Sequence, residues 1–191
     1  MKKWECAIIC QIVLCSLILF LPKTGAAFGY NAKEHFETAN ITFPSPDSAQ
    51  SEKYLGLSAM KPFKLGQIKA KVVVIEFMSA LCEYCSLNAT KMNYVYRTVQ
   101  ENPKLAPNVK IIAIGVASNV PQLNAFKKQH DIPFPMLNDA DGRIGTAMGE
   151  MPTPTTLIVS AASGKVLYSH VGLIWSADGF VKNIKDLIKK N

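Results

Sequence analysis

Residues that bind metals or build disulfide frameworks are scarce in this sequence of 191 residues. It contains three histidines, which are single and far apart (His35, His130 and His170), and five cysteines, of which only Cys82 and Cys85 lie beyond residue 15. A tetrahedral zinc site needs two further Cys or His ligands beside such a pair. We therefore expect no metal and no other cofactor. A repeat with a period of about 20–50 residues is also missing, which excludes solenoids and propellers.

Charge is the second feature in short supply. Charged residues make up 18% of the chain and hydrophobic residues 49%, a balance that excludes disorder as a description of the whole chain. The net charge of +7 comes from scattered lysines, and beyond residue 27 adjacent pairs occur only at 127–128 and 189–190. A nucleic-acid-binding protein gathers its basic residues in a patch or stripe. We therefore expect a solvated surface and no nucleic-acid partner.

One long hydrophobic run is present, and it lies at the N-terminus. Residues 7–21 are almost entirely apolar, two lysines precede them, and Pro22 and the small residues 25–27 follow. This order is typical of secretion, so residues 1–27 are predicted to be a signal peptide. The alternative is a retained membrane anchor through residues 7–21, although a spanning helix usually needs about 20 apolar residues. Both interpretations place the domain outside the cytoplasm, in the periplasm or at the outer face of the membrane.

Export changes the meaning of the odd number of cysteines. Cys6, Cys10 and Cys15 fall in the signal segment, so the exported chain keeps only Cys82 and Cys85. A structural disulfide stabilises most when it closes a long loop, and a Cys-x-x-Cys pair closes a very short one. The spacing favours a reversible dithiol, in which the second thiol always lies beside the first. A structural disulfide and half of a zinc site are the alternatives.

The exported chain divides into an irregular lead-in over residues 28–53 and one domain over residues 54–191. Runs of β-branched and apolar residues predict buried strands, and the segments between them predict helices. The expected strands are 72–77, 109–116, 155–160 and 165–171, with short ones at 41–43 and 63–65, and the expected helices are 86–100, 121–130, 143–148 and 179–190. Buried strands joined through helices pair in parallel, and the last two strands suit an antiparallel hairpin. The predicted fold is α/β, with a central mixed sheet flanked by helices.

The cysteine pair lies where the first long strand ends and a helix begins. Free N–H groups and the dipole at a helix N-terminus stabilise a thiolate. Cys82 is therefore predicted to attack a substrate disulfide, and the more buried Cys85 to resolve the mixed disulfide, which leaves a Cys82–Cys85 disulfide. Glu76 interrupts the apolar strand before this pair. A buried carboxylate has a raised pKa that suits proton transfer, although a neighbouring Lys or Tyr would also explain its burial.

Two further features of the sequence point to a docking site for a substrate. Pro154 enters a central strand, where proline breaks the hydrogen-bond ladder unless the backbone has a special geometry, such as a cis Thr153–Pro154 bond. Tyr84 lies between the two cysteines, where an exposed side chain would meet a partner; the alternative for Tyr84 is packing. His130 and His170 are expected to be surface or structural residues.

From about residue 55 to the C-terminus, the chain resembles the thioredoxin superfamily, most closely the exported TlpA/ResA-like thiol–disulfide oxidoreductases and the related redoxin domains. The matching segments are 63–65, 71–77, 82–85, 153–158 and 164–166. The resemblance implies a thioredoxin-like fold with catalysis by Cys82 and Cys85. It also implies that the Thr153–Pro154 step is cis and orients the partner beside the dithiol, and that Glu76 transfers a proton.

The resemblance also implies a reaction and its partners. The expected substrates are disulfide-containing exported proteins, including apocytochrome c before haem attachment, and the expected electron donor is a membrane thiol–disulfide protein. Glu83 places a negative charge beside Cys82, which opposes the thiolate and favours a reductant. The sequence departs from the family at Met78 and Leu81, where tryptophan is common, and it lacks a proline between the cysteines.

Two other classes of protein fit parts of the sequence. A redoxin-type thiol peroxidase with antioxidant activity would use Cys82 against peroxide, with Ser79 three residues before it, but the upstream proline of such sites is missing. A non-catalytic thioredoxin-fold binding module would keep its function after both cysteines are replaced.

Overall fold

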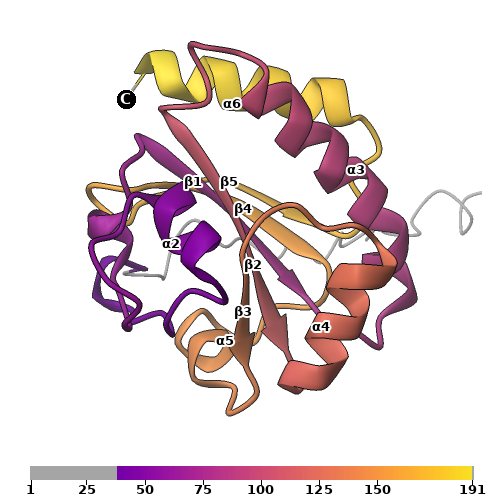
Figure 1. The fold of residues 1–191 in the computed structure, drawn as a ribbon. Coiled ribbons are helices and arrows are strands. Elements are labelled where there is room, and N and C mark those ends of the chain that lie inside the picture. Colours follow the sequence, from indigo (N-terminus) through magenta and orange to yellow (C-terminus); the bar gives the residue numbers. More distant parts are fainter. Residues whose placement is uncertain (1–37, 191) are drawn as a thin grey trace, which may run out of the picture. The chain divides into compact units, whose positions relative to one another are not determined.

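The computed structural model describes residues 38–190. The predicted signal or anchor segment and residues 28–37 of the predicted lead-in lie outside the described residues. Between residues 38 and 190, no helix has both the length and the apolar character needed to cross a membrane. The described chain forms a five-stranded sheet in the order β3-β2-β1-β4-β5 with helices packed on it, which confirms the predicted α/β fold (Figure 1).

The central strand β1 (Val72–Met78) is buried along its whole length, as expected for a β-branched strand covered on both faces. It pairs in parallel with β2 (Val109–Val116) and antiparallel with β4 (Thr155–Ser160). Beyond β4, β5 (Val166–Val171) completes the predicted antiparallel hairpin. These four strands confirm the sequence prediction to within one residue at each end.

A short strand that was not predicted, β3 (Met136–Asp139), extends the sheet in parallel beyond β2. It has only four residues, two of them apolar and two polar, which is too short for a period to show. With β3 in place, the carboxyl ends of three parallel strands meet at one edge of the sheet.

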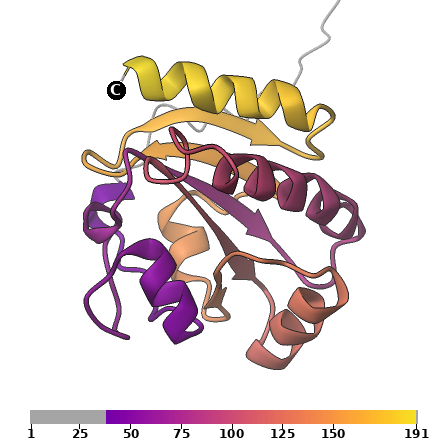
Figure 2. The ribbon, with the colours of Figure 1, turned by 45° about the horizontal axis from the view of Figure 1, so that its top comes forward.

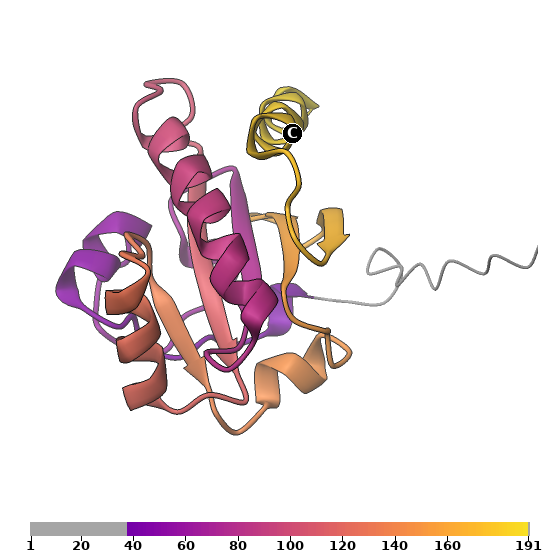
Figure 3. The same cartoon turned by 90° about the vertical axis from the view of Figure 1, so that its right-hand side faces the viewer.

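Three helices cover one face of this sheet: α3 (Glu83–Gln100), α4 (Val120–Gln129) and α6 (Ala177–Lys190). Their apolar residues join Val74 of β1 in one buried cluster, and α3 and α6 lie side by side (Figures 1 and 2). The short helix α5 (Arg143–Ala147) contacts β3 from the other side of the strands (Figure 3). All four predicted helices are confirmed, although α3 begins three residues earlier than expected.

The prediction of an irregular lead-in is wrong for residues 49–53, which are helical. Helix α2 (Ala49–Leu55) begins at Ser48, whose hydroxyl accepts a hydrogen bond from the N–H of Ser51, and ends at Gly56 with a left-handed φ of 70°. The helix is only seven residues long, so its apolar face is too brief for a clear pattern.

The two short strands expected at 41–43 and 63–65 reduce to a single bridge between Phe43 and Phe63. The two rings stack with their centroids 5.7 Å apart. The 3-10 helices η2 (Thr38–Asn40) and η3 (Leu65–Gln67) flank this bridge and occupy the residues that would have extended it.

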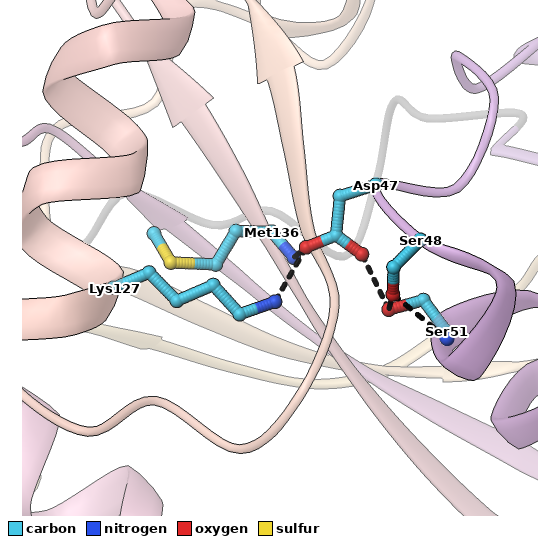
Figure 4. Close-up of polar contacts among 5 residues, drawn as sticks. All are labelled: Asp47, Ser48, Ser51, Lys127 and Met136. Atoms are coloured by element: carbon cyan, nitrogen blue, oxygen red, sulfur yellow. Dashed lines mark hydrogen bonds and ion pairs between the residues drawn. The ribbon is translucent and has the colours of Figure 1, made fainter.

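Asp47, just before α2, ties this helix to the rest of the domain (Figure 4). Its carboxylate forms an ion pair with Lys127 of α4, accepts a hydrogen bond from the N–H of Met136 at 3.2 Å, and accepts another from the hydroxyl of Ser51. One side chain therefore connects α2, α4 and β3.

Tyr54 of α2 covers the part of β2 that β3 is too short to reach, because β3 pairs only with residues 113–116. The hydroxyl of Tyr54 accepts a hydrogen bond from the N–H of Ile111 at 2.9 Å, and the ammonium of Lys110 lies 4.7 Å from the centre of its ring. Burial raises the pKa of the Tyr54 phenol. An exposed strand edge can pair with another chain, and Tyr54 protects this one.

Candidate active site

The segment between β1 and α3 is held by hydrogen bonds from the neighbouring strand ends. The N–H of Ala80 donates to the hydroxyl of the buried Ser118 at 3.0 Å, and the side-chain amide of Asn138 donates to the carbonyl oxygen of Ser118 at 2.7 Å. Both partners lie at the edge where the parallel strands end. Asn138 was not predicted as part of the site because it lies on β3, and Ser118 was not because its contact with Ala80 joins residues 38 positions apart. They fix the loop that leads into Cys82.

Cys82 is the N-cap residue of α3 and is partly buried. Its sulfur accepts a hydrogen bond from the N–H of Cys85 at 3.3 Å, and its thiol donates to the carbonyl oxygen of Thr153 at 3.5 Å. Burial alone raises the pKa of the Cys82 thiol, but hydrogen bonds from Cys85, from the side chain of Thr153 and from the N–H of Tyr84 lower it more, so the pKa lies below its ordinary value. The charge of Glu83 does not reverse this shift. The geometry supports the expected thiolate.

Cys85 lies one turn into α3 and is almost completely buried, with 1% of its surface exposed. Burial, followed by the hydrogen bond to Cys82, raises the pKa of the Cys85 thiol. Both cysteines are free thiols in this structure. The helix start therefore holds two thiols of different character, an accessible one that ionises readily and a buried one that keeps its proton.

The peptide bond between Thr153 and Pro154 is cis, as the resemblance implies. The carbonyl oxygen of Thr153 lies 3.5 Å from the Cys82 sulfur, so this turn is beside the dithiol. The carbonyl oxygen of Pro154 accepts a hydrogen bond from the N–H of Gly172 at 2.7 Å, which ties the turn to the end of β5. The structure thus brings Cys82, Cys85 and the Thr153–Pro154 step together.

Glu76 is 4% exposed and makes its hydrogen bond with Asn88, whose amide nitrogen donates to Oε1 at 2.8 Å. The amide oxygen of Asn88 accepts from the N–H of Ile174 at 2.9 Å. Burial raises the pKa of Glu76 to about 7, and the hydrogen bond from Asn88 offsets this only in part. The alternative of a Lys or Tyr partner is wrong. Because Asn88 is three residues after Cys85, it lies on the same side of α3, and Glu76 faces the buried thiol's side of the helix.

Tyr84 points away from the core, with 63% of its surface exposed, so the packing alternative is wrong. Leu81, just before the dithiol, is 76% exposed. Leu87 lies one turn after Tyr84 and is exposed, and so is Trp175, which follows Ile174. Leu81 and Tyr84, which flank Cys82 in the sequence, therefore offer apolar and aromatic surface beside the dithiol.

His130 and His170, which were expected to be surface or structural residues, make their contacts with residues other than Cys82 and Cys85. The ring of His130 packs on Phe126 with centroids 4.3 Å apart, and Nε2 of His170 lies 2.9 Å from the carbonyl oxygen of Leu173. In the part of the chain that the structure describes, no three His, Cys, Asp or Glu side chains gather in a group that could hold a metal ion.

A dithiol at a strand-to-helix junction beside a cis-proline, on a mixed five-stranded sheet, defines a thiol–disulfide oxidoreductase with a thioredoxin-like fold. The AhpC/TSA family model matches residues 46–169, and the chain belongs to that family.

Curated relatives are thiol–disulfide oxidoreductases named ResA. The protein from Bacillus subtilis is 26% identical over 129 residues, which cover 68% of each chain. The one from Geobacillus thermodenitrificans is 25% identical over 178 residues, 93% of this chain and 94% of the relative.

Solved structures show the same fold. A secreted disulfide oxidoreductase of Mycobacterium tuberculosis, homologous to DsbE of E. coli, superposes with a TM-score of 0.58 at 20% identity, over 78% of this chain and 98% of the other. StoA from Bacillus subtilis superposes with a TM-score of 0.57 at 14% identity, over 76% and 97% of the two chains.

Proposed function

We propose that the protein reduces disulfides in proteins outside the cytoplasm, with Cys82 as the attacking and Cys85 as the resolving residue. The observation that carries the proposal is the contrast between the two thiols. Cys82 is accessible and has a lowered pKa, whereas Cys85 is buried and has a raised one. A thiolate is the nucleophile in thiol–disulfide exchange, so the first attack falls to Cys82.

In the first step, the Cys82 thiolate attacks one sulfur of the substrate disulfide. The bond between the substrate sulfurs breaks, a mixed disulfide with Cys82 forms, and the departing substrate sulfur takes a proton from water. Thr153 and Pro154 shape the groove beside Cys82, and the exposed ring of Tyr84 contacts the substrate.

In the second step, the Cys85 sulfur attacks the Cys82 sulfur of the mixed disulfide. The carboxylate of Glu76 accepts the Cys85 proton, the Cys82–Cys85 disulfide forms, and the bond to the substrate breaks. The substrate leaves as a thiolate that takes a proton from water. Two electrons have then passed from the dithiol to the substrate, and the protein is oxidised.

The direction of electron flow follows from the charges at the start of α3. Glu83 is acidic, and the first turn, residues 83–86, carries no basic side chain. A strong oxidant needs a strongly stabilised thiolate, and hydrogen bonds alone stabilise this one. We therefore propose a reductant that is recharged by a membrane thiol–disulfide protein.

Two observations support a location outside the cytoplasm. Residues 1–27 have the pattern of a signal peptide or anchor, and the Mycobacterium tuberculosis protein of the same fold is described as secreted. Among exported substrates we propose apocytochrome c, whose cysteines must be reduced before haem attachment.

The direction is tested by equilibrating the dithiol with glutathione. We expect a reduction potential below about −220 mV, the range of reducing dithiols. A potential near about −120 mV, the range of strong oxidants, would contradict the proposal.

The roles of the two cysteines are tested by trapping. Cys85→Ser should accumulate a mixed disulfide with oxidised apocytochrome c, because Cys82 attacks and nothing resolves the product. Cys82→Ser is the matched control and should accumulate none. Full biological function of the double variant Cys82→Ser/Cys85→Ser, which cannot reduce the substrate, would instead indicate a non-catalytic binding module.

A peroxidase is not favoured by the site. The hydroxyl of Ser79 lies 3.3 Å from the N–H of Leu81 and 3.4 Å from the hydroxyl of Ser118. Among residues 38–190, it makes no hydrogen bond with the Cys82 sulfur.

A further inference from the structure

Three polar residues on neighbouring strands form a row across the sheet face that α3 and α6 cover. Glu76 of β1 lies directly opposite Thr156 of β4, and Thr156 lies directly opposite His170 of β5. Residues opposite each other on antiparallel strands point to the same face, with Cβ atoms about 4.5–5.5 Å apart. Two residues away on the same face lie Val74 and Ile158, both in the apolar cluster. The row therefore crosses an otherwise apolar face.

The middle residue of the row has an unused hydroxyl. Thr156 is completely buried, and its Oγ1 has no hydrogen-bond partner among residues 38–190. A buried hydroxyl without a partner is costly and uncommon in folded proteins. A threonine hydroxyl both donates and accepts, so one placed between an acid and an imidazole is able to pass a proton from one to the other.

The two ends of the row differ in access to water. At the inner end, Glu76 faces the side of α3 that carries Cys85 and Asn88. At the outer end, His170 lines a hollow between β5 and the start of α6, together with Trp175, which is 82% exposed. The row thus leads from the side of the buried thiol to solvent.

The surroundings of Glu76 offer few other proton carriers. On β2 the opposite residue is Ala113, and α6 contributes apolar side chains to the cluster. On α3 the neighbours are Cys85, which is the proton donor in the proposed reaction, and Asn88, whose amide oxygen is occupied by the N–H of Ile174. Within the described residues, Glu76 makes no ion pair.

We propose that Thr156 and His170 carry the proton of Glu76 to solvent, a role that rests on the proposed transfer of a proton from Cys85 to Glu76. The protonated acid gives its proton to the Thr156 hydroxyl, which passes a proton on to His170. The imidazole releases it to water in the hollow beside Trp175, and water molecules bridge the row where side chains do not touch. No electrons move along this path, and Glu76 returns to the carboxylate.

Stopped-flow mixing of the reduced protein with excess oxidised glutathione tests this path, because it separates formation of the mixed disulfide from its decay. At about pH 6, Glu76 is mostly protonated and must lose its proton before it accepts one from Cys85. At about pH 9, it is already a carboxylate. Thr156→Val and His170→Phe should slow the decay about tenfold at the lower pH and leave it unchanged at the higher pH. Formation, which depends on Cys82, should not change.

Ser169→Ala is the matched control. Ser169 precedes His170 on β5, its side chain points to the opposite face, and its hydroxyl is also buried without a partner among residues 38–190. This variant should decay like the unchanged protein, and Thr156→Ser, which restores a hydroxyl, should recover the lost rate. An unchanged decay in Thr156→Val, or an equal slowing in Ser169→Ala, would overturn the proposal.

Glu76→Gln separates this inference from the proposed function. Slow decay at both pH values in Glu76→Gln, with slow decay only at the lower pH in Thr156→Val, supports both the role of Glu76 and the path through Thr156 and His170. Slow decay in Glu76→Gln with normal decay in Thr156→Val refutes the path alone. Normal decay in Glu76→Gln refutes the role of Glu76 and the path with it.

Discussion

At the scale of single residues, burial decides the chemistry of Glu76 and Cys85. Cys85 belongs to the apolar cluster on the α3 side of the sheet, Glu76 contacts Asn88 on the same side, and burial raises the pKa of each. Each group therefore favours its neutral form in the folded protein, and burial makes the charged form that it takes during the reaction less stable. For Glu76, the charged form lowers the free energy of unfolding, and this loss of stability grows as the pH rises.

We predict that Glu76→Gln stabilises the reduced protein at high pH. The pKa of Glu76 rises from 4.5 to about 7 on folding, so the folded state holds the proton more tightly than the unfolded chain. Stability from this group is present below pH 4.5 and is lost as the pH rises to about 7, by at most about 3 kcal/mol. Urea unfolding at about pH 8 should show the gain for the glutamine variant, and at about pH 4 the two proteins should differ little. A gain that is equal at both pH values would contradict the assignment.

A second prediction at this scale concerns Gly164. It has a φ of 69°, and an added Cβ would lie 2.2 Å from the backbone nitrogen of Ala39. Gly142 has a φ of 68° and no atom within 4 Å of such a Cβ, so it isolates the backbone cost. Gly142→Ala should lose about 1 kcal/mol of unfolding free energy and Gly164→Ala clearly more. Equal losses of unfolding free energy would contradict this prediction, because they would mean that the backbone at Ala39 moves aside without a cost in free energy.

Residues near each other in sequence could be predicted, and those joined through the fold could not. The dithiol at a helix start, the unusual Thr153–Pro154 step and the buried Glu76 were all visible in local sequence. The role of Asn88 was not predicted, because its side chain joins Glu76 to Ile174, and Ile174 lies 86 positions after Asn88. Its place in the site depends on how α3 packs on the sheet.

At the scale of elements, length separates what was predicted from what was missed. The long, β-branched strands and the helices between them have enough residues to show a period. The segments α2 and β3 do not, and contacts made after folding stabilise them. Asp47 is the clearest example, because it holds the start of α2 against α4 and β3 (Figure 4).

We predict that Asp47→Ala destabilises the protein by about 1–3 kcal/mol, because it leaves the N–H of Met136 and the ammonium of Lys127 without their partner. Asp141→Ala is the control, since Asp141 pairs with Arg143 where both side chains are well exposed, and such pairs contribute little. Urea unfolding measures both variants. The reduction potential should not change in either, and a shift in Asp47→Ala would indicate that α2 influences the dithiol.

At the scale of the whole molecule, the redox state of the dithiol is linked to folding. A dithiol that is a stronger reductant in the folded protein than in the unfolded chain makes the disulfide form the more stable fold. Each 30 mV of that difference corresponds to about 1.4 kcal/mol.

We therefore predict that the oxidised protein unfolds at a higher urea concentration than the reduced protein. The double variant Cys82→Ser/Cys85→Ser is the control and should show no dependence on added reductant. An oxidised form that is the less stable one would contradict the proposed reductant, because it would place the potential on the oxidising side.

Trp175 turns the loop before α6 into a built-in optical reporter. The sequence contains one other tryptophan, Trp4, within the predicted signal, so in a chain that begins after residue 27 Trp175 is the single tryptophan. The residue before it, Ile174, is joined through Asn88 to Glu76. We therefore expect the emission of this single indole to change when the buried acid gains or loses its proton, so that turnover could be followed in real time without a label.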